Sequence, residues 1–297
     1  MYIKDIFTKK KPVISFEIFP PKPSASIQTI YNTIDALAPL RPDYISVTYG
    51  AGGSTSKKTV EIASMIKNTY DIEALAHLTG ITSNKKEINN ILEELNENNI
   101  ENVLALRGDL PQDPEFKLSE ELDFKYASDL IKHIKINQKF CIGGACYPEG
   151  HMDTTKEKDL FNLGKKVDAG VDFLISQLFL DNHFFYEFKE KTIKRNIDIP
   201  IQAGIMPVIN KNQIRRIISL CGAYIPKKFL KVIDKYENNP EALKDAGIAY
   251  ATDQIIDLLS SGVDGIHIYT MNNPEVAKRI VSNISSIIYA LNKKHAV

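Results

Sequence analysis

Eight short apolar segments alternate along this chain with segments whose apolar residues recur at helical spacing. The short segments are rich in valine, isoleucine, phenylalanine and tyrosine, which favour strands. A strand followed by a helix, repeated eight times in about 250 residues, is typical of a (β/α)8 barrel, an α/β fold. The sequence therefore predicts such a TIM barrel, with strands near residues 13–19, 43–49, 72–78, 102–109, 140–147, 173–180, 199–208 and 264–270.

Helical spacing is clearest after the first, third and seventh apolar segments. Ser24 and Ser26 precede the first of these helices and Ser83 precedes "NKKEINNILEEL", and serine often begins a helix. Residues 226–250 form an insertion before the eighth strand, which we expect to be helical. The apolar residues at helical spacing are Ile30, Ile34 and Leu37; Ile88, Ile91, Leu92 and Leu95; and Ile214, Ile217, Ile218 and Leu220.

A doubly wound open sheet is the alternative arrangement for alternating strands and helices. Such a sheet normally carries a glycine-rich turn after its first strand, whereas "FPPKPSAS" follows here. No linker, low-complexity tract or further internal repeat divides the chain. We therefore expect residues 1–297 to form one barrel domain.

Charge and cysteine content argue against several classes of protein. The 37 Lys and Arg residues balance 37 Asp and Glu residues, so no net charge attracts nucleic acid or an anionic membrane. The segment "MYIKDIFTKKKP" lacks the apolar core of a secretory signal, and no apolar run could span a bilayer, so we expect a cytoplasmic protein. Cys141, Cys146 and Cys221 include no C-x-x-C pair, which argues against disulfides and a zinc site.

Each predicted strand offers a polar residue at or just after its C-terminal end. In a (β/α)8 barrel these ends gather at one rim, where active sites lie. Any one of these residues alone would more often be structural, but their convergence at one rim favours a site. They are Glu17, Thr48, His77, Arg107, Asp109, Tyr147, Gln177, Gln213, Tyr269 and Thr270.

Glu17 is the most informative of these residues because it interrupts the apolar run "VISFEIFPP". Phe16, Ile18 and Phe19 flank it, and a partly desolvated carboxyl group tends to keep its proton near neutral pH, as a general acid must. Asp109 closes "ALRGDLP", where Gly108 would let the backbone approach a ligand closely. A cap on a short helix is an equally good interpretation of Asp109.

Nine motifs, in their order along the chain, resemble those of the methylenetetrahydrofolate reductase family. The resemblance covers nearly the whole chain and is closest to the bacterial form that consists of the catalytic domain alone. The motifs are "SFEIFPPK", "YISVTYGAGGS", "AHLTG", "LALRGDLP", "YASDL", "ACYPEGH", "LGKKVDAGVDFLISQLFLD", "IMPV" and "IHIYTMN".

The resemblance implies a flavoprotein oxidoreductase built on a (β/α)8 barrel. Members of the family reduce 5,10-methylenetetrahydrofolate to 5-methyltetrahydrofolate with NADH or NADPH, by a ping-pong scheme through FAD. The product serves methionine biosynthesis and one-carbon metabolism. The resemblance also implies a small-molecule folate substrate and a homo-oligomer, without deciding between NADH and NADPH or between dimer and tetramer.

The same resemblance assigns roles to individual residues. Glu17 matches the general acid that protonates folate N10, and Asp109 matches a catalytic residue near the flavin and the pterin. Asp109, Gln177 and Gln213 match substrate contacts, and Arg107, Lys165 and Lys166 supply cations for the FAD pyrophosphate. The residues at FAD-contacting positions are Thr48, Tyr49, Ala51, His77, Arg107, Gly108, Asp109, Ala127, Tyr147, His151, Asp159, Asn162, Lys165 and Lys166.

Two positions depart from the family pattern. Ile217 stands where an aromatic residue can meet the nicotinamide or the folate, and Asn273 stands where an arginine can reach the folate glutamate. They bear on affinity and on the electron donor rather than on the reaction class. Two alternatives stay open: a pterin-binding barrel for methyl transfer, and a subunit that receives electrons from a partner protein.

Overall fold

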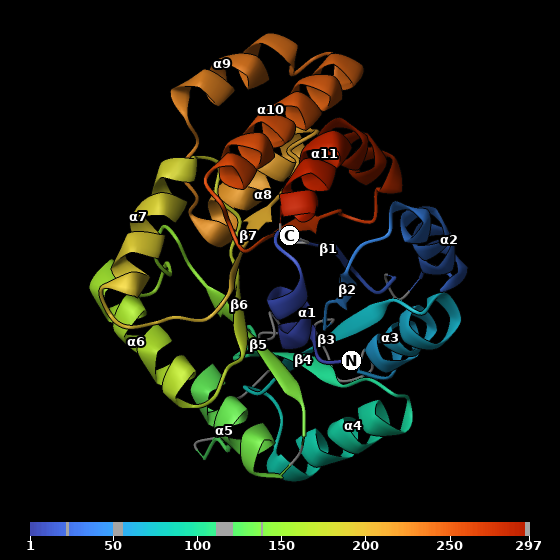
Figure 1. Ribbon diagram of the computed structural model, residues 1–297, viewed down its shortest axis with the longest axis vertical. Coiled ribbons are helices and arrows are strands. Elements are labelled where there is room, and N and C mark those ends of the chain that lie inside the picture. Colours follow the sequence, from blue (N-terminus) through green and yellow to red (C-terminus); the bar gives the residue numbers. More distant parts are fainter. Residues whose placement is uncertain (22–23, 50–55, 111–120, 138, 295–297) are drawn as a thin grey trace.

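The computed structural model describes residues 1–21, 24–49, 56–110, 121–137 and 139–294. Within them, eight parallel strands close into a barrel, because β8 pairs with β1 as well as with β7. The open-sheet alternative is therefore excluded, and the predicted barrel is confirmed (Figure 1). The strands are β1 (Val13–Ile18), β2 (Tyr44–Val47), β3 (Glu73–Thr79), β4 (Asn102–Leu106), β5 (Cys141–Cys146), β6 (Phe173–Ser176), β7 (Ile201–Ile205) and β8 (Gly265–Tyr269).

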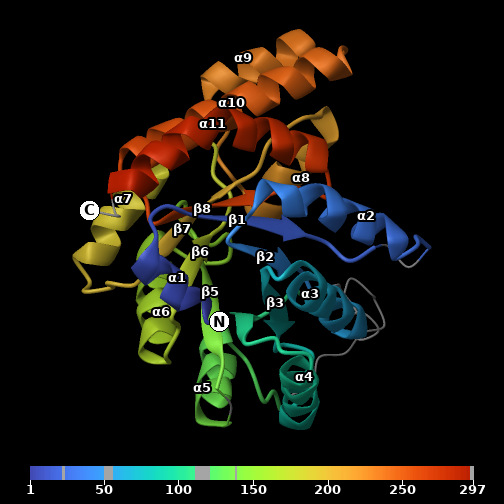
Figure 2. The same cartoon turned by 45° about the vertical axis from the view of Figure 1, so that its right-hand side comes forward.

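Helices surround the strands, and Figure 2 shows that α9 and α10 lie on the side of the barrel opposite α4 and α5. The inserted segment is helical as predicted, since it forms α9 and the first half of α10. The helices are α1 (Ile3–Lys9), α2 (Gln28–Leu37), the short 3-10 helix η1 (Ala38–Leu40), α3 (Ser56–Tyr70), α4 (Lys85–Glu97), α5 (Ala127–Asn137), α6 (Lys156–Asp168), α7 (Asn182–Ile193), α8 (Lys211–Cys221), α9 (Lys227–Tyr236), α10 (Pro240–Ser260) and α11 (Pro274–Lys294). None of the helices in these ranges has the length and apolar character needed to cross a membrane.

The helix starts differ by a residue or more from the predicted serines. Asn84, not Ser83, caps α4: its side chain accepts from the Glu87 backbone while the Glu87 side chain accepts from the Asn84 backbone, a capping box. Before α2 the Ser26 hydroxyl accepts from the Gln28 backbone at 3.2 Å, although the cap position itself is Ile27. Ile34, Leu37, Ile88, Leu92, Leu95, Ile214 and Ile217 are buried as their spacing predicts, while the side chains of Ile218 and Leu220 lie outside the described part.

Helix α1 closes the N-terminal end of the barrel, and in Figure 1 it lies at the centre of the ring of helices. Its Ile3 and Ile6 are buried against side chains from the barrel interior, including Tyr44 and Phe173. The Ile3 N–H donates to Asn102 Oδ1 at 2.8 Å. Helix α1 therefore seals the barrel interior at this end, and the polar residues at the C-terminal ends of the strands lie at the opposite, open end.

Three aspartates at the sealed end repeat one arrangement. Each stands just before an even-numbered strand, accepts a backbone N–H from the strand that precedes it in the chain, and pairs with lysine. Asp43 accepts from Ile14 N at 2.7 Å and pairs with Lys10; Asp172 accepts from Ile142 N at 2.8 Å and pairs with Lys4 and Lys135; Asp264 accepts from Ile201 N at 3.0 Å and pairs with Lys11 and Lys189.

Candidate active site

Glu17 lies at the open end of β1, and its backbone is fixed by the segment after β8. The Thr270 hydroxyl donates to the Glu17 carbonyl oxygen at 2.6 Å. Two residues further along each segment, the Asn272 side chain accepts from Phe19 N at 2.8 Å and donates to Phe19 O at 2.9 Å. These bonds extend the β1–β8 pairing beyond the strands, so the position of Glu17 is set by the closure of the barrel.

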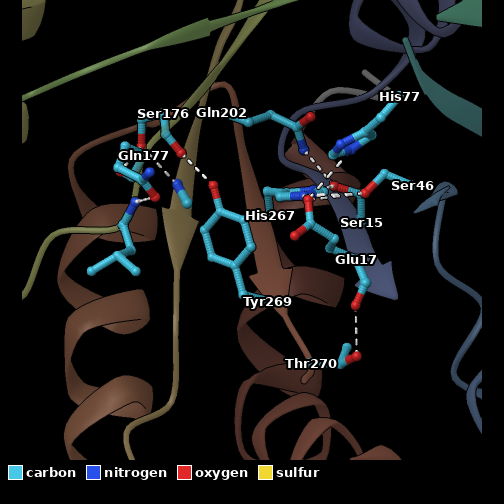
Figure 3. Close-up of polar contacts among 12 residues, drawn as sticks. Ser15, Glu17, Ser46, His77, Ser176, Gln177, Gln202, His267, Tyr269 and Thr270 are labelled. Atoms are coloured by element: carbon cyan, nitrogen blue, oxygen red, sulfur yellow. Dashed lines mark hydrogen bonds and ion pairs between the residues drawn. The ribbon is translucent and has the colours of Figure 1, made fainter. Parts of the chain in front are cut away.

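The carboxyl group of Glu17 is buried, with an exposed fraction of 7%. In the part of the chain that the structure describes, its contacts all fall on Oε2: Ser46 Oγ at 3.4 Å, His77 Nε2 at 3.4 Å and His267 Nε2 at 3.5 Å (Figure 3). Burial lowers the pKa of His77 to about 4, although the Glu17 charge works in the opposite direction. Glu17 therefore faces a neutral imidazole at His77.

The sequence did not single out Ser15, Ser46, Gln202 or His267, which line the barrel interior around Glu17. Ser15 lies two residues before Glu17, and His267 lies two residues before Tyr269, so both point to the same face of their strands as a predicted site residue. A period-two repeat of polar residues inside an apolar strand is the signal that could have revealed them.

A cavity of about 510 Å³ opens beside β4, β5 and α6. Many residues that line it are predicted FAD contacts: Arg107, Ala127, Tyr147, His151, Asp159, Asn162, Lys165 and Lys166. The sequence missed other polar residues of the lining, namely Lys125, Tyr126, Ser128, Asp153, Thr154 and Lys158. The spacing of Asp159, Asn162 and Lys166 on α6 does bring them to one side, as predicted.

Lys166 and Asp159 both line this cavity, and each lies within the electrostatic influence of the other. Lys166 Nζ donates to the Ala145 carbonyl oxygen at 2.7 Å and lies 5.6 Å from the centre of the Tyr147 ring. Burial lowers the pKa of Lys166 and raises the pKa of Asp159, and the attraction between the two charges opposes both shifts. A bound anion would oppose the effect of burial and favour the charged form of Lys166.

The cavity fits the diphosphate of a dinucleotide. Arg107, Lys165 and Lys166 make no ion pair with a carboxylate among the described residues. In the same part of the chain, the hydroxyl of Thr154 is buried and has no hydrogen-bond partner. Cations and an unsatisfied hydroxyl around one cavity are the groups that hold phosphate oxygens.

Gly108 and Asp109 follow β4 at the edge of this region. Gly108 has a φ of +85°, and a Cβ there would lie 2.8 Å from Thr79 Cβ, so the position requires glycine. Asp109 is exposed. Burial is the main cause that raises the pKa of Tyr147 and of Cys221, and the negative charge of Asp109 adds to this effect. Residues 111–120 lie outside the described part, so a helix capped by Asp109 is not tested.

The other predicted residues lie around the same rim. Thr48 and Tyr49 follow β2 and are half-buried, while Ala51 lies outside the described residues. Gln177 was predicted to lie within the sixth strand, but β6 ends at Ser176 and Gln177 is the next residue. Its side-chain oxygen accepts from Leu178 N at 2.8 Å. Gln213 lies in the first turn of α8, where its side-chain oxygen accepts from Ile209 N at 2.8 Å.

The structure shows what surrounds Ile217 and Asn273, the two residues that depart from the family pattern. Ile217 is buried in an apolar cluster with Phe229 and Leu243 from α9 and α10, so the inserted helices cover it. Asn273 precedes α11, and its Oδ1 accepts from Val276 N at 3.3 Å, which is a helix-capping role.

Comparisons with known proteins agree on one family. The family model of methylenetetrahydrofolate reductase matches residues 2–285. The chain is 36% identical to 5,10-methylenetetrahydrofolate reductase of Escherichia coli K12, over 90% of this chain and 88% of that protein. It is 35% identical to methylenetetrahydrofolate reductase (NADH) 1 of Arabidopsis thaliana, over 96% of this chain and 50% of that protein. The chain thus spans about half the length of the plant relative.

A solved structure shares the fold at low sequence identity. It is an uncharacterized protein from Clostridium thermocellum that binds two copies of 5-methyl-5,6,7,8-tetrahydrofolic acid. The TM-score is 0.64 at 14% identity, and the match covers 98% of this chain and 100% of that one. At this identity the match supports the fold alone.

Proposed function

Because the chain belongs to the methylenetetrahydrofolate reductase family, we propose that it reduces 5,10-methylenetetrahydrofolate to 5-methyltetrahydrofolate, with NADH or NADPH as donor and FAD as cofactor in a ping-pong cycle. One observation carries the proposal beyond family membership. A buried carboxyl group, Glu17, lies at the same open rim as a cavity whose lining includes Arg107, Lys165 and Lys166, and these three make no ion pair with a carboxylate in the described part of the chain. This combination suits a proton donor beside a dinucleotide site.

In the proposed reaction, Glu17 gives its proton to N10 of the folate. The bond between N10 and the bridging carbon breaks, and the electron pair of that bond takes the proton while N5 and the bridging carbon form an iminium. The FAD cofactor, once reduced by NADH or NADPH, would supply the hydride that turns this carbon into the methyl group. Contacts on Oε2 hold the Glu17 carboxyl group in one orientation, so that Oε1 can face the substrate.

Other residues of the rim bind and orient in this proposal. Arg107, Lys165 and Lys166 hold the diphosphate, and Thr154 offers it an unsatisfied hydroxyl. Asp109, Gln177 and Gln213 contact the substrate. For Gln177 and Gln213 this requires the NH2 ends of the side chains, because the oxygens are engaged by backbone N–H groups. The proposed cofactor contacts also include Thr48, Tyr49, Ala51, His77, Gly108, Asp109, Ala127, Tyr147, His151, Asp159 and Asn162.

An anaerobic visible spectrum of the purified protein tests the proposal. We expect a flavin absorbance band that bleaches when NADH or NADPH is added and returns when methylenetetrahydrofolate is added. A flavin that neither nucleotide bleaches would favour a partner protein as electron donor, and the burial of Ile217 makes that outcome worth testing. A protein that binds no flavin even when FAD is supplied would refute the proposal in favour of pterin methyl transfer.

A further inference from the structure

Behind Glu17, a chain of buried polar side chains crosses the barrel interior. The Tyr44 hydroxyl donates to Gln202 Oε1, Gln202 Nε2 lies 3.1 Å from Ser15 Oγ, and Ser15 Oγ lies 2.7 Å from His267 Nδ1. All four side chains have an exposed fraction of 0%. Interiors of such barrels are usually filled by branched apolar residues, so a polar chain at this depth needs an explanation.

The polar chain ends inside the protein. Tyr44 is packed among Ile3, Leu75 and Leu104, under helix α1. Burial raises the pKa of Tyr44 far above its usual range, so this hydroxyl keeps its proton. The chain is therefore no route for protons from solvent, and any effect on the reaction has to act through its other end, at Glu17.

The direction of the hydrogen bonds follows from the groups that can only accept. Gln202 Nε2 lies 3.2 Å from Val13 O and 3.4 Å from Ile266 O, and since carbonyl oxygens only accept, this atom is the donating NH2 group. Gln202 Nε2 therefore cannot accept the Ser15 hydrogen, which is available to His267 Nδ1. The distance of 2.7 Å agrees with an O–H donor.

A ring whose Nδ1 accepts carries its single proton on Nε2, which faces Glu17 Oε2 at 3.5 Å. We propose that His267 is a positioning residue for Glu17, held by Ser15 as a neutral imidazole whose Nε2–H faces the carboxyl group. This inference rests on the proposed function, because it concerns the proton that Glu17 gives to the folate.

A neutral N–H donor suits the proton transfer, because it supports the carboxylate that remains after the proton has left. Ser15 keeps this N–H in place, since its donation to Nδ1 leaves Nε2 as the protonated nitrogen. The other titratable groups around the His267 ring are Tyr44, His77 and Tyr269. Burial raises the pKa of both tyrosines and lowers the pKa of His77. All three side chains are therefore neutral.

The tautomer can be measured without substrate, by NMR of the full chain labelled with ¹⁵N-histidine and with His267→Gln to assign the signals. We expect the neutral ring of His267 to carry its proton on Nε2 and none on Nδ1. In Ser15→Ala the partner of Nδ1 is lost, and the ring should shift toward the tautomer with its proton on Nδ1. A proton on Nδ1 in the wild type, or a tautomer that Ser15→Ala leaves unchanged, would overturn the inference.

Kinetics supply the second readout. In the other tautomer, His267 Nε2 has no hydrogen to donate to the carboxylate that Glu17 becomes. In Ser15→Ala the reduction of methylenetetrahydrofolate should therefore be about tenfold slower, while flavin reduction by NADH or NADPH is unchanged. Thr192→Val is the matched control, since it removes a buried hydroxyl that donates to Lys189 O at 2.8 Å on α7, away from the site.

The outcomes separate the two hypotheses. If Ser15→Ala leaves the rate of methylenetetrahydrofolate reduction in place, or if Thr192→Val lowers it equally, the inference fails while the reductase assignment stands. If the wild type carries out neither half-reaction, the proposed function fails, and the tautomer measurement still decides how His267 is held.

Discussion

The two ends of the barrel use the same kinds of charged side chain in opposite ways. At the sealed end, Asp43, Asp172 and Asp264 pair with lysines at 2.6 to 3.3 Å and also accept backbone N–H groups. At the open end, the contacts of the Glu17 carboxyl group are 3.4 to 3.5 Å long, and the cations of the cavity have no carboxylate partner among the described residues. Charges with partners inside the fold stabilise it, whereas charges without them are available to a ligand.

The largest expected effect of a substitution lies at the open end. Glu17→Gln removes the proposed proton donor but keeps the size of the side chain, so reduction of methylenetetrahydrofolate should be slower by about 10²–10⁴-fold. Flavin reduction by NADH or NADPH needs no proton for the folate and should be nearly unchanged. Rapid-mixing measurements of the two half-reactions test this. An equal loss in both would make Glu17 a structural residue and would weaken the contrast between the two ends.

The pH dependence of the free energy of unfolding should also differ between the two ends of the barrel. His77 provides the test at the open end. The pKa of His77 is about 4 in the folded protein against 6.5 for an ordinary histidine, so below pH 6.5 the unfolded chain binds a proton that the folded chain does not. The free energy of unfolding should therefore fall by on the order of 3 kcal/mol as pH drops from 6.5 to 4.

Urea unfolding at several pH values measures this loss, and His77→Gln should flatten it. His183→Gln is the control, because it replaces a histidine whose side chain is 70% exposed, and it should keep the wild-type decline. A variant without His77 that still loses the same stability in acid would contradict the assignment.

A smaller effect is expected at the sealed end, from Asp264→Asn. This change removes the ion pairs with Lys11 and Lys189 and should lower the free energy of unfolding by about 2 kcal/mol, with both half-reactions unchanged per folded molecule. Burial would raise the pKa of Asp264, but its hydrogen bonds from the two lysines outweigh burial and lower it. Its stabilisation is therefore present above pH 3.8 and lost below, a window separate from that of His77.

The control for the sealed end is Asp245→Asn, which breaks an exposed ion pair with Arg279. Exposed pairs of this kind contribute about 0–1 kcal/mol. Denaturant unfolding of both variants at neutral pH gives the comparison. If the two substitutions cost the same, the aspartates of the sealed end would be ordinary surface charges.

The smallest effect is expected for Asp109→Asn. Asp109 is exposed, so its charge is partly screened by solvent. Removing a negative charge near a bound flavin should favour the reduced, more negative form and raise the midpoint potential, with weaker folate binding as a second consequence. A redox titration that shows no shift would count against a position for Asp109 beside the flavin.

The sequence predicted the barrel because eight strand–helix units leave few other arrangements, and it predicted the rim because strand ends meet there. The helix starts were predicted less accurately. Asn84, not Ser83, caps α4, because adjacent polar residues compete for one cap position. The environment of Glu17 was beyond prediction: Ser46 and His267 come from β2 and β8, and only the closed barrel brings them to one oxygen. Backbone N–H groups engage the side-chain oxygens of Gln177 and Gln213 and leave the NH2 ends to a ligand, and no sequence motif encodes these contacts.

The closure of the barrel at β1 and β8 has a consequence for folding. His267 is separated from Glu17 by 250 positions and Thr270 by 253, while Ser46 is separated by 29. Contacts between residues so far apart in the chain form late, because the entropy of closing a long loop opposes them. During synthesis, the carboxyl group of Glu17 leaves the ribosome long before the strand that completes its surroundings. We therefore expect a partly folded or shortened chain to have no partial activity, since the surroundings of Glu17 are complete only when β8 has paired with β1.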